Sequence, residues 1–167
     1  MCIRDSGTGA LGRVMQAVVN REAVRRAVIP AAGISTTARD LARFYRMLLA
    51  GGTAGRRRLL QRATIDAALV PPADERVDRV AHYPIRWTAG FQLGGPRSVA
   101  GTVSPLGASS SERAFGHNGS NCCIAWADPD RDLVFVYLTN RVGWPLPDLR
   151  HHAAVADRVL AAVRGDP

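Results

Sequence analysis

Residues 115–138, FGHNGSNCCIAWADPDRDLVFVYL, decide the fold of this chain. Two apolar runs, 122–127 and 133–138, are rich in β-branched and aromatic residues and flank the turn-forming sequence Asp128-Pro129-Asp130-Arg131-Asp132. This pattern predicts an antiparallel hairpin. The second run is apolar without interruption, which predicts a central strand buried on both faces. His117 lies between two glycines just before the hairpin.

Helices are predicted on both sides of this hairpin. Thr36 or Thr37 is the expected N-cap of one helix; from Thr37, Asp40 has the spacing of a capping box, and Gly51-Gly52 ends the helix. Between them the apolar residues recur at helical spacing, at Leu41, Phe44, Tyr45, Leu48 and Leu49. Four further elements are expected. They are a short helix after Asn20, a helix over 63–70, a strand over 86–93 and a final helix capped by Asp148. Helices, then antiparallel strands, then a helix indicate an α+β fold.

All 22 basic residues are arginine, and the net charge is +8. We interpret the arginine content as codon usage and the run at 56–58 as a solvated loop, because no aromatic residue accompanies it; no nucleic-acid partner is expected. No apolar run reaches the ~18 residues of a membrane span, so none is expected in this chain. Cys122 and Cys123 are neighbours that point to opposite faces of a strand. We expect reduced thiols, which favour the cytoplasm without determining the compartment.

No self-contained catalytic motif is recognisable in the sequence. The chain lacks G-x-S-x-G, H-E-x-x-H, C-x-x-C and a phosphate-binding loop, and without lysine it contains no S-x-x-K. His151 and His152 are adjacent, so on a helix they point about 100° apart and make a poor metal pair. We therefore expect no metal and no cofactor. His117 stands out, although a histidine at a strand entry is by itself more often a structural residue than a catalytic one.

Four stretches in order resemble the β-lactamase-related serine hydrolases, including family VIII-type carboxylesterases. They span about residues 18–142 and comprise Asn20 to Gly33, Thr36 to Phe44, Gly55 to Leu60 with Ala63-Thr64-Ile65, and Phe115 through Ala127-Asp128-Pro129 to Asn140-Arg141.

The resemblance implies an antiparallel sheet flanked by helices, with a helical subdomain beside it. It also implies a serine nucleophile in S-x-x-K, a Tyr in Y-x-N or Y-x-S, and a third motif, K-T-G or H-x-G, along the site's edge. His117 takes the place of the third motif's basic residue, Gly119 leaves room for substrate, and the Ser120 backbone N–H is an oxyanion donor. Asn118 and Asn121 are the expected substrate-binding neighbours.

The first two motifs have no counterpart in these residues, since Tyr45, Tyr83 and Tyr137 lack Asn or Ser two positions later. We therefore expect a truncated β-lactamase/transpeptidase-like domain. Residues 1–6 are a junction or artefact, 7–85 are the remainder of the helical subdomain with a site-lining loop, and 86–167 are the C-terminal strands and helix.

We expect the chain to be a C-terminal fragment of a serine hydrolase that is inactive alone. Its parent forms an acyl-enzyme with small-molecule esters, or with β-lactam or amide bonds. The alternative is a non-catalytic pseudoenzyme or assembly partner with the same fold. The sequence does not determine the oligomeric state.

Overall fold

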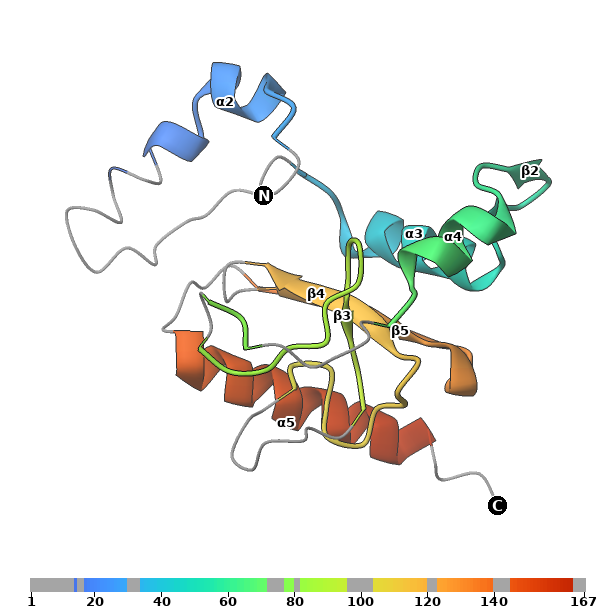
Figure 1. The fold of residues 1–167 in the computed structure, drawn as a ribbon. Coiled ribbons are helices and arrows are strands. Elements are labelled where there is room, and N and C mark those ends of the chain that lie inside the picture. Colours follow the sequence, from blue (N-terminus) through green and yellow to red (C-terminus); the bar gives the residue numbers. More distant parts are fainter. Residues whose placement is uncertain are drawn as a thin grey trace.

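The computed structural model describes residues 14, 17–29, 34–71, 77–79, 82–95, 104–119, 123–139 and 145–163. The junction expected at residues 1–6 lies outside them. The helices are α2 (Glu22–Arg26), α3 (Ala38–Leu49), α4 (Arg62–Ala68), the 3-10 turn η1 (Pro129–Arg131) and α5 (Pro145–Val163). The strands are β1 (Thr53–Ala54), β2 (Arg57–Arg58), β3 (Gln92–Leu93), β4 (Phe115–Gly119), β5 (Cys123–Asp128) and β6 (Leu133–Leu138) (Figure 1).

The main sheet has the antiparallel order β3-β4-β5-β6. The predicted hairpin is confirmed: β5 and β6 pair from Cys123 with Leu138 to Asp128 with Leu133. The central position predicted for residues 133–138 is not found within the described part of the chain. Among the described residues β6 lies at the sheet's edge, and all six of its residues are half-buried. The residues of β6 are apolar because they pack alternately against the cores on the two faces of the sheet.

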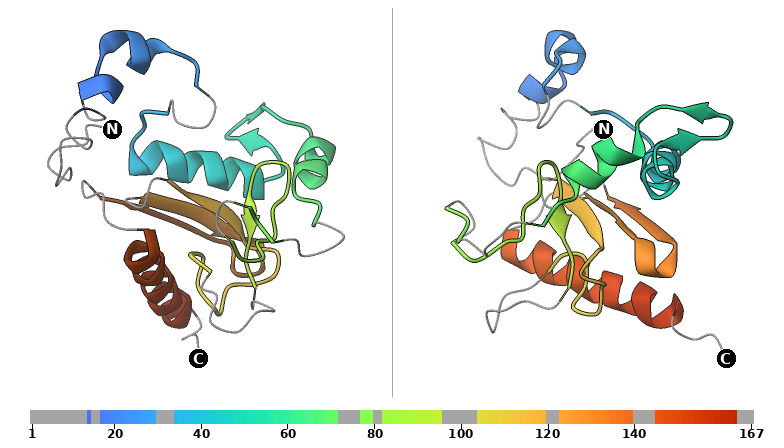
Figure 2. Two further views of the ribbon diagram at one scale, coloured as in Figure 1. Left: turned by 60° about the vertical axis from the view of Figure 1, so that its left-hand side comes forward. Right: turned by 45° about the vertical axis from the view of Figure 1, so that its right-hand side comes forward.

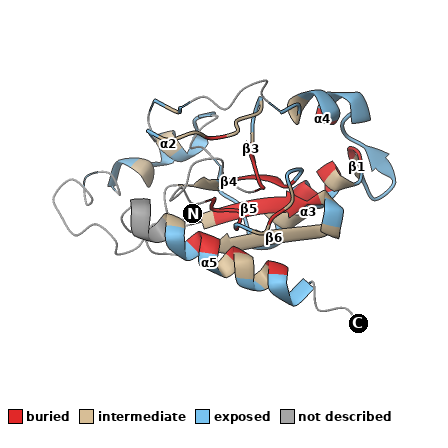
Figure 3. Ribbon diagram, turned by 60° about the horizontal axis from the view of Figure 1, so that its bottom comes forward, coloured by how far each residue is buried: buried red, intermediate tan, exposed pale blue. Residues whose placement is uncertain are grey.

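Helices cover both faces of the sheet, with α3 and α4 on one side and α5 on the other (Figures 1 and 2). The core on the α3 side contains Tyr45, Met47, Leu48, Ile65, Leu93, Phe115, Ala125 and Ala127. The core on the α5 side contains Leu106, Ala114, Ile124, Trp126, Ala156 and Leu160. Strand β5 contributes to both cores by alternation, and all of its residues after Cys123 are buried (Figure 3).

Helix α3 forms where its periodicity predicts. The Thr37 hydroxyl accepts a hydrogen bond from the backbone N–H of Asp40 at 3.1 Å, which satisfies one of the free donors of the first turn. Tyr45 and Leu48 are buried as expected. Met47 is buried too, whereas Phe44 is 42% exposed, so the buried stripe is rotated slightly from the predicted one.

The strand predicted over 86–93 is largely wrong. Its residues form a tight reversal in which the Thr88 N–H donates to the Phe91 carbonyl at 2.8 Å and the Phe91 N–H donates to the Thr88 hydroxyl at 3.1 Å. Only β3 and an isolated bridge between Trp87 and Gln92 remain extended. The hydroxyl of Thr88 thus supplies a turn that the apolar pattern does not reveal.

Both terminal helices start elsewhere than predicted. Helix α5 begins at Pro145, ahead of the expected cap at Asp148, because proline suits the first turn of a helix. Helix α2 has Arg21 rather than Asn20 at its N-cap and buries none of its residues. No helix in the described parts of the chain is long and apolar enough to cross a membrane.

Candidate active site

His117 lies in the middle of β4, opposite Ala125 of β5, and its side chain is exposed. Phe115 and Ala125 both belong to the core on the α3 side, so strand alternation directs His117 and Gly119 to that same face. Asn118 pairs with Ile124, which belongs to the core on the α5 side. The Asn118 side chain therefore points to the opposite face of the sheet from His117.

The two glycines that flank His117 have different surroundings. A Cβ built on Gly116 would lie 2.4 Å from the Ala125 carbonyl oxygen and 2.4 Å from Trp126 Cβ, so β4 and β5 approach closely only because this Cβ is absent. A Cβ on Gly119 would meet one side-chain atom, the sulfur of Cys123, at 2.8 Å. Among the described residues, the Cys123 thiol is the group that borders the space beside Gly119, and Cys123 is a free cysteine of intermediate exposure.

Tyr45 of α3 is buried against the start of β4, with its ring 6.0 Å from that of Phe115. Burial raises the pKa of its phenol well above the ordinary value, and a backbone hydrogen bond from His117 lowers it only in part. The phenol is therefore un-ionised at neutral pH. Tyr45 anchors the backbone at His117.

Two contacts orient the imidazole of His117. Its ring stacks on the indole of Trp87, with centroids 5.1 Å apart and planes inclined by 29°. Its Nδ1 makes a hydrogen bond with the carbonyl oxygen of Asn118. Because a carbonyl only accepts, Nδ1 is the donor, so Nε2 accepts when the ring is neutral and donates when it is protonated.

Sequence reasoning missed Trp87 as a site residue. In the sequence Trp87 is recognisable only as a bulky residue of an expected strand. No local pattern connects it with a histidine thirty positions later. Ser120 and Asn121, the other expected site residues, lie outside the described residues. Their roles as an oxyanion donor and a substrate contact stay predictions.

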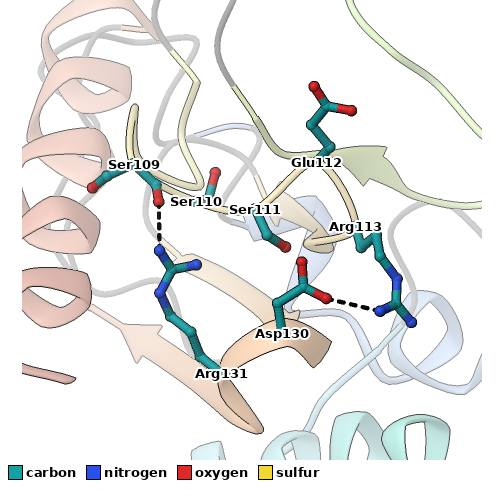
Figure 4. Close-up of a pocket in the computed structure, with 7 residues that line it drawn as sticks. All are labelled: Ser109, Ser110, Ser111, Glu112, Arg113, Asp130 and Arg131. Carbon is teal, nitrogen blue, oxygen red and sulfur yellow. Dashed lines mark hydrogen bonds and ion pairs between the residues drawn. The ribbon is translucent and has the colours of Figure 1, made fainter. Parts of the chain in front are cut away.

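An open cavity of about 570 Å³ lies away from His117, lined by Ser109, Ser110, Ser111, Glu112, Arg113, Asp130 and Arg131 (Figure 4). Its charged groups are largely paired with one another. Arg131 bonds the buried carboxylate of Asp128 and donates to the Ser109 carbonyl at 3.0 Å, while Arg113 bonds Asp130 at 2.8 Å. This network holds the loop before β4 against η1, which is a structural role.

The described residues contain no group of three or more metal-ligating side chains. His151 lies on α5, where its Nε2 is 3.0 Å from the Tyr137 hydroxyl. That pair belongs to the α5 side of the sheet, because Tyr137 packs against the core there.

Comparison with known proteins shows the family. The Beta-lactamase family model matches residues 4–160, so the chain belongs to the beta-lactamase family. It shares 33% identity over 132 residues with the 6-aminohexanoate-dimer hydrolase of Paenarthrobacter ureafaciens, a match that covers 78% of this chain and 30% of that protein. It shares 32% identity over 120 residues with the esterase/beta-lactamase LipL of Mycobacterium tuberculosis, a match that covers 72% and 25%.

A solved structure gives the same result. A penicillin-binding protein homologue from Caulobacter crescentus superposes with a TM-score of 0.56 and 31% identity, over 73% of this chain and 30% of that one. The chain therefore has the expected β-lactamase/transpeptidase-like fold. It spans about a third or less of the length of these three relatives.

Proposed function

We propose that this chain forms the third-motif edge of a serine hydrolase active site that cleaves carboxylic esters through an acyl-enzyme. The observation that carries the proposal is the placement of His117. It is exposed on the face of β4 that α3 covers, with Gly119 two positions on and on the same face. A hydrolase named for the 6-aminohexanoate dimer and an esterase/beta-lactamase are among the relatives, which supports acyl transfer as the reaction class.

His117 acts through Nε2, since Nδ1 is occupied by the Asn118 carbonyl. A neutral ring accepts a proton there from a catalytic Tyr hydroxyl, and a protonated ring donates a hydrogen bond to the substrate. Asn118 contributes through its main chain, because its side chain points to the other face. Asn121 would line the substrate edge.

Gly119 and Ser120 are proposed to bind the acyl group of the substrate. Without a Cβ at Gly119, an ester lies close along β4, as in a strand addition. The Ser120 N–H then donates to the oxyanion that forms when the carbonyl is attacked, and losing one such donor typically costs about 2.7–4 kcal/mol in the transition state. The second donor is the N–H of the nucleophile itself.

The nucleophile is proposed to belong to an S-x-x-K motif outside these 167 residues, because they contain no lysine. That serine attacks the ester carbonyl, the alcohol leaves with a proton, and water then hydrolyses the acyl-enzyme. Activity therefore requires the segment that carries this motif.

Labelling tests this proposal directly. The product of the complete reading frame that contains this chain is treated with a fluorophosphonate, digested and mapped by mass spectrometry. We expect a single adduct on a serine followed three residues later by lysine, and none on the 167 residues of this chain. A product without any adduct would support a non-catalytic protein of the same fold and overturn the proposal.

A further inference from the structure

The contact between Trp87 and His117 joins two segments that are far apart in the chain. Trp87 is half-buried and precedes the tight reversal at Thr88, whereas His117 is on β4 and exposed. The indole covers one face of the imidazole. A ring stacked in this way is restricted in its rotation, so the direction of Nε2 depends on where the indole is held.

Asp78 holds the indole. The Trp87 Nε1–H donates to the Asp78 carboxylate at 3.0 Å. The backbone of Asp78 is itself fixed, because its N–H donates to the Tyr83 carbonyl at 3.0 Å and its carbonyl accepts from the His82 N–H at 2.8 Å. A hydrogen bond to an ionised acceptor is roughly twice as strong as a neutral one. The carboxylate therefore fixes the plane of the indole.

We propose that Asp78 and Trp87 form a positioning pair for His117. The carboxylate fixes the indole, the indole fixes the plane of the imidazole, and the Asn118 carbonyl fixes which ring edge faces inward. Nε2 takes no part in these two contacts. This inference rests on the proposed function for its kinetic consequence, whereas the positioning of the ring depends on the contacts alone.

The chain contains a natural control. Tyr137 and His151 form a second aromatic–histidine pair, with centroids 5.7 Å apart, on the α5 side of the sheet. Replacing Tyr137 perturbs an equivalent contact at a place that has no part in the proposed site. Any effect specific to the Trp87 pair must therefore differ between the two replacements.

The geometry is tested by NMR on this chain, with the His117 ring resonances assigned by their loss in His117→Gln. We expect ring-current shifts to place them upfield in the wild type and to a smaller extent in Trp87→Phe, which keeps an aromatic face but loses the hydrogen bond to Asp78. They should return toward the free-imidazole position in Trp87→Leu and in Asp78→Leu. Asp78→Asn keeps an acceptor without the charge, so its shifts should lie between those of the wild type and Asp78→Leu, and Tyr137→Leu should leave them unmoved. Identical His117 resonances in the wild type and Trp87→Leu would overturn the proposal.

The kinetic arm uses the active hydrolase that contains this chain. Trp87→Leu should lower kcat by about tenfold with KM little changed, because misplacing a catalytic group costs turnover. In a His117→Ala background the same change should have no further effect, and Trp87→Phe, which keeps the ring but not its hydrogen bond to Asp78, should have a kcat between those of the wild type and Trp87→Leu. Independent, multiplying effects of the two changes would refute positioning. If the wild-type protein hydrolyses no ester, the proposed function fails and the NMR result alone decides the positioning pair.

Discussion

Replacing Gly116 by alanine is expected to destabilise the chain more than any other single methyl addition to β4. The added Cβ would lie 2.4 Å from the Ala125 carbonyl oxygen, 2.4 Å from Trp126 Cβ and 2.6 Å from Trp126 Cα. Carbon atoms pack at about 3.5–4.0 Å, so the two strands would have to separate by roughly 1 Å. Two of the three obstructing atoms belong to the backbone, so no side-chain rotation relieves the contact.

Overpacking of a core typically costs about 1–3 kcal/mol, and we expect Gly116→Ala at the upper end because β5 is almost fully buried. A domain of this kind is stable by about 5–15 kcal/mol, so the effect is large enough to measure. Gly90→Ala is the matched control. It places the same methyl group where no atom of the described residues beyond its chain neighbours lies within 4 Å, and it should change stability by less than about 0.5 kcal/mol.

Urea unfolding followed by tryptophan fluorescence measures both variants. The midpoint of Gly116→Ala should fall well below that of Gly90→Ala, at an unchanged denaturant slope. Equal midpoints would refute the close approach of β4 and β5 and, with it, the placement of His117.

Three further outcomes are expected. Arg131→Ala removes the ion-pair partner of the fully buried Asp128 and should lower the free energy of unfolding by about 3 kcal/mol. Arg113→Ala breaks an exposed ion pair and should lower it by less than about 1 kcal/mol. Similar losses for the two variants in urea unfolding would contradict this expectation. The pKa of Tyr45 is raised in the fold, so its contribution to stability is complete below pH about 10 and is lost as pH rises toward the folded pKa. Tyr45→Phe should therefore flatten the alkaline decline of the urea midpoint, and an unchanged decline would count against it. In hydrogen exchange, amides of β5 should be protected throughout, whereas those on the open edge of β6 should exchange quickly; uniform protection of β6 would indicate a further strand beside it.

The elements with strong local signals were predictable. Thr37 and the glycines after α3 define that helix by capping chemistry and backbone freedom, both of which depend on single residues. The hairpin of β5 and β6 follows from two apolar runs around a turn. The position of β6 within the sheet was not predictable, because an uninterrupted apolar run arises wherever both faces are covered, whether or not strands lie on both sides.

The site was predictable only along the strand that carries it. His117 and Gly119 could be named from their resemblance to the third motif of the family, and alternation gives their shared face. Trp87 and Asp78 could not, since their contacts depend on how a loop returns to β4 and no local pattern records that. The Asn118 side chain was expected at the substrate, but the register with Ile124 turns it to the α5 face.

The most direct test of the central claim is ester turnover by the hydrolase that contains this chain, with His117→Ala compared with His151→Ala. Both changes remove an exposed imidazole, one at the proposed site and one on α5. The account predicts at least about a tenfold loss of kcat/KM for His117→Ala, or ~1.4 kcal/mol of transition-state stabilisation, and little change for His151→Ala. Equal turnover in the two variants would contradict the assignment of His117 to the active site.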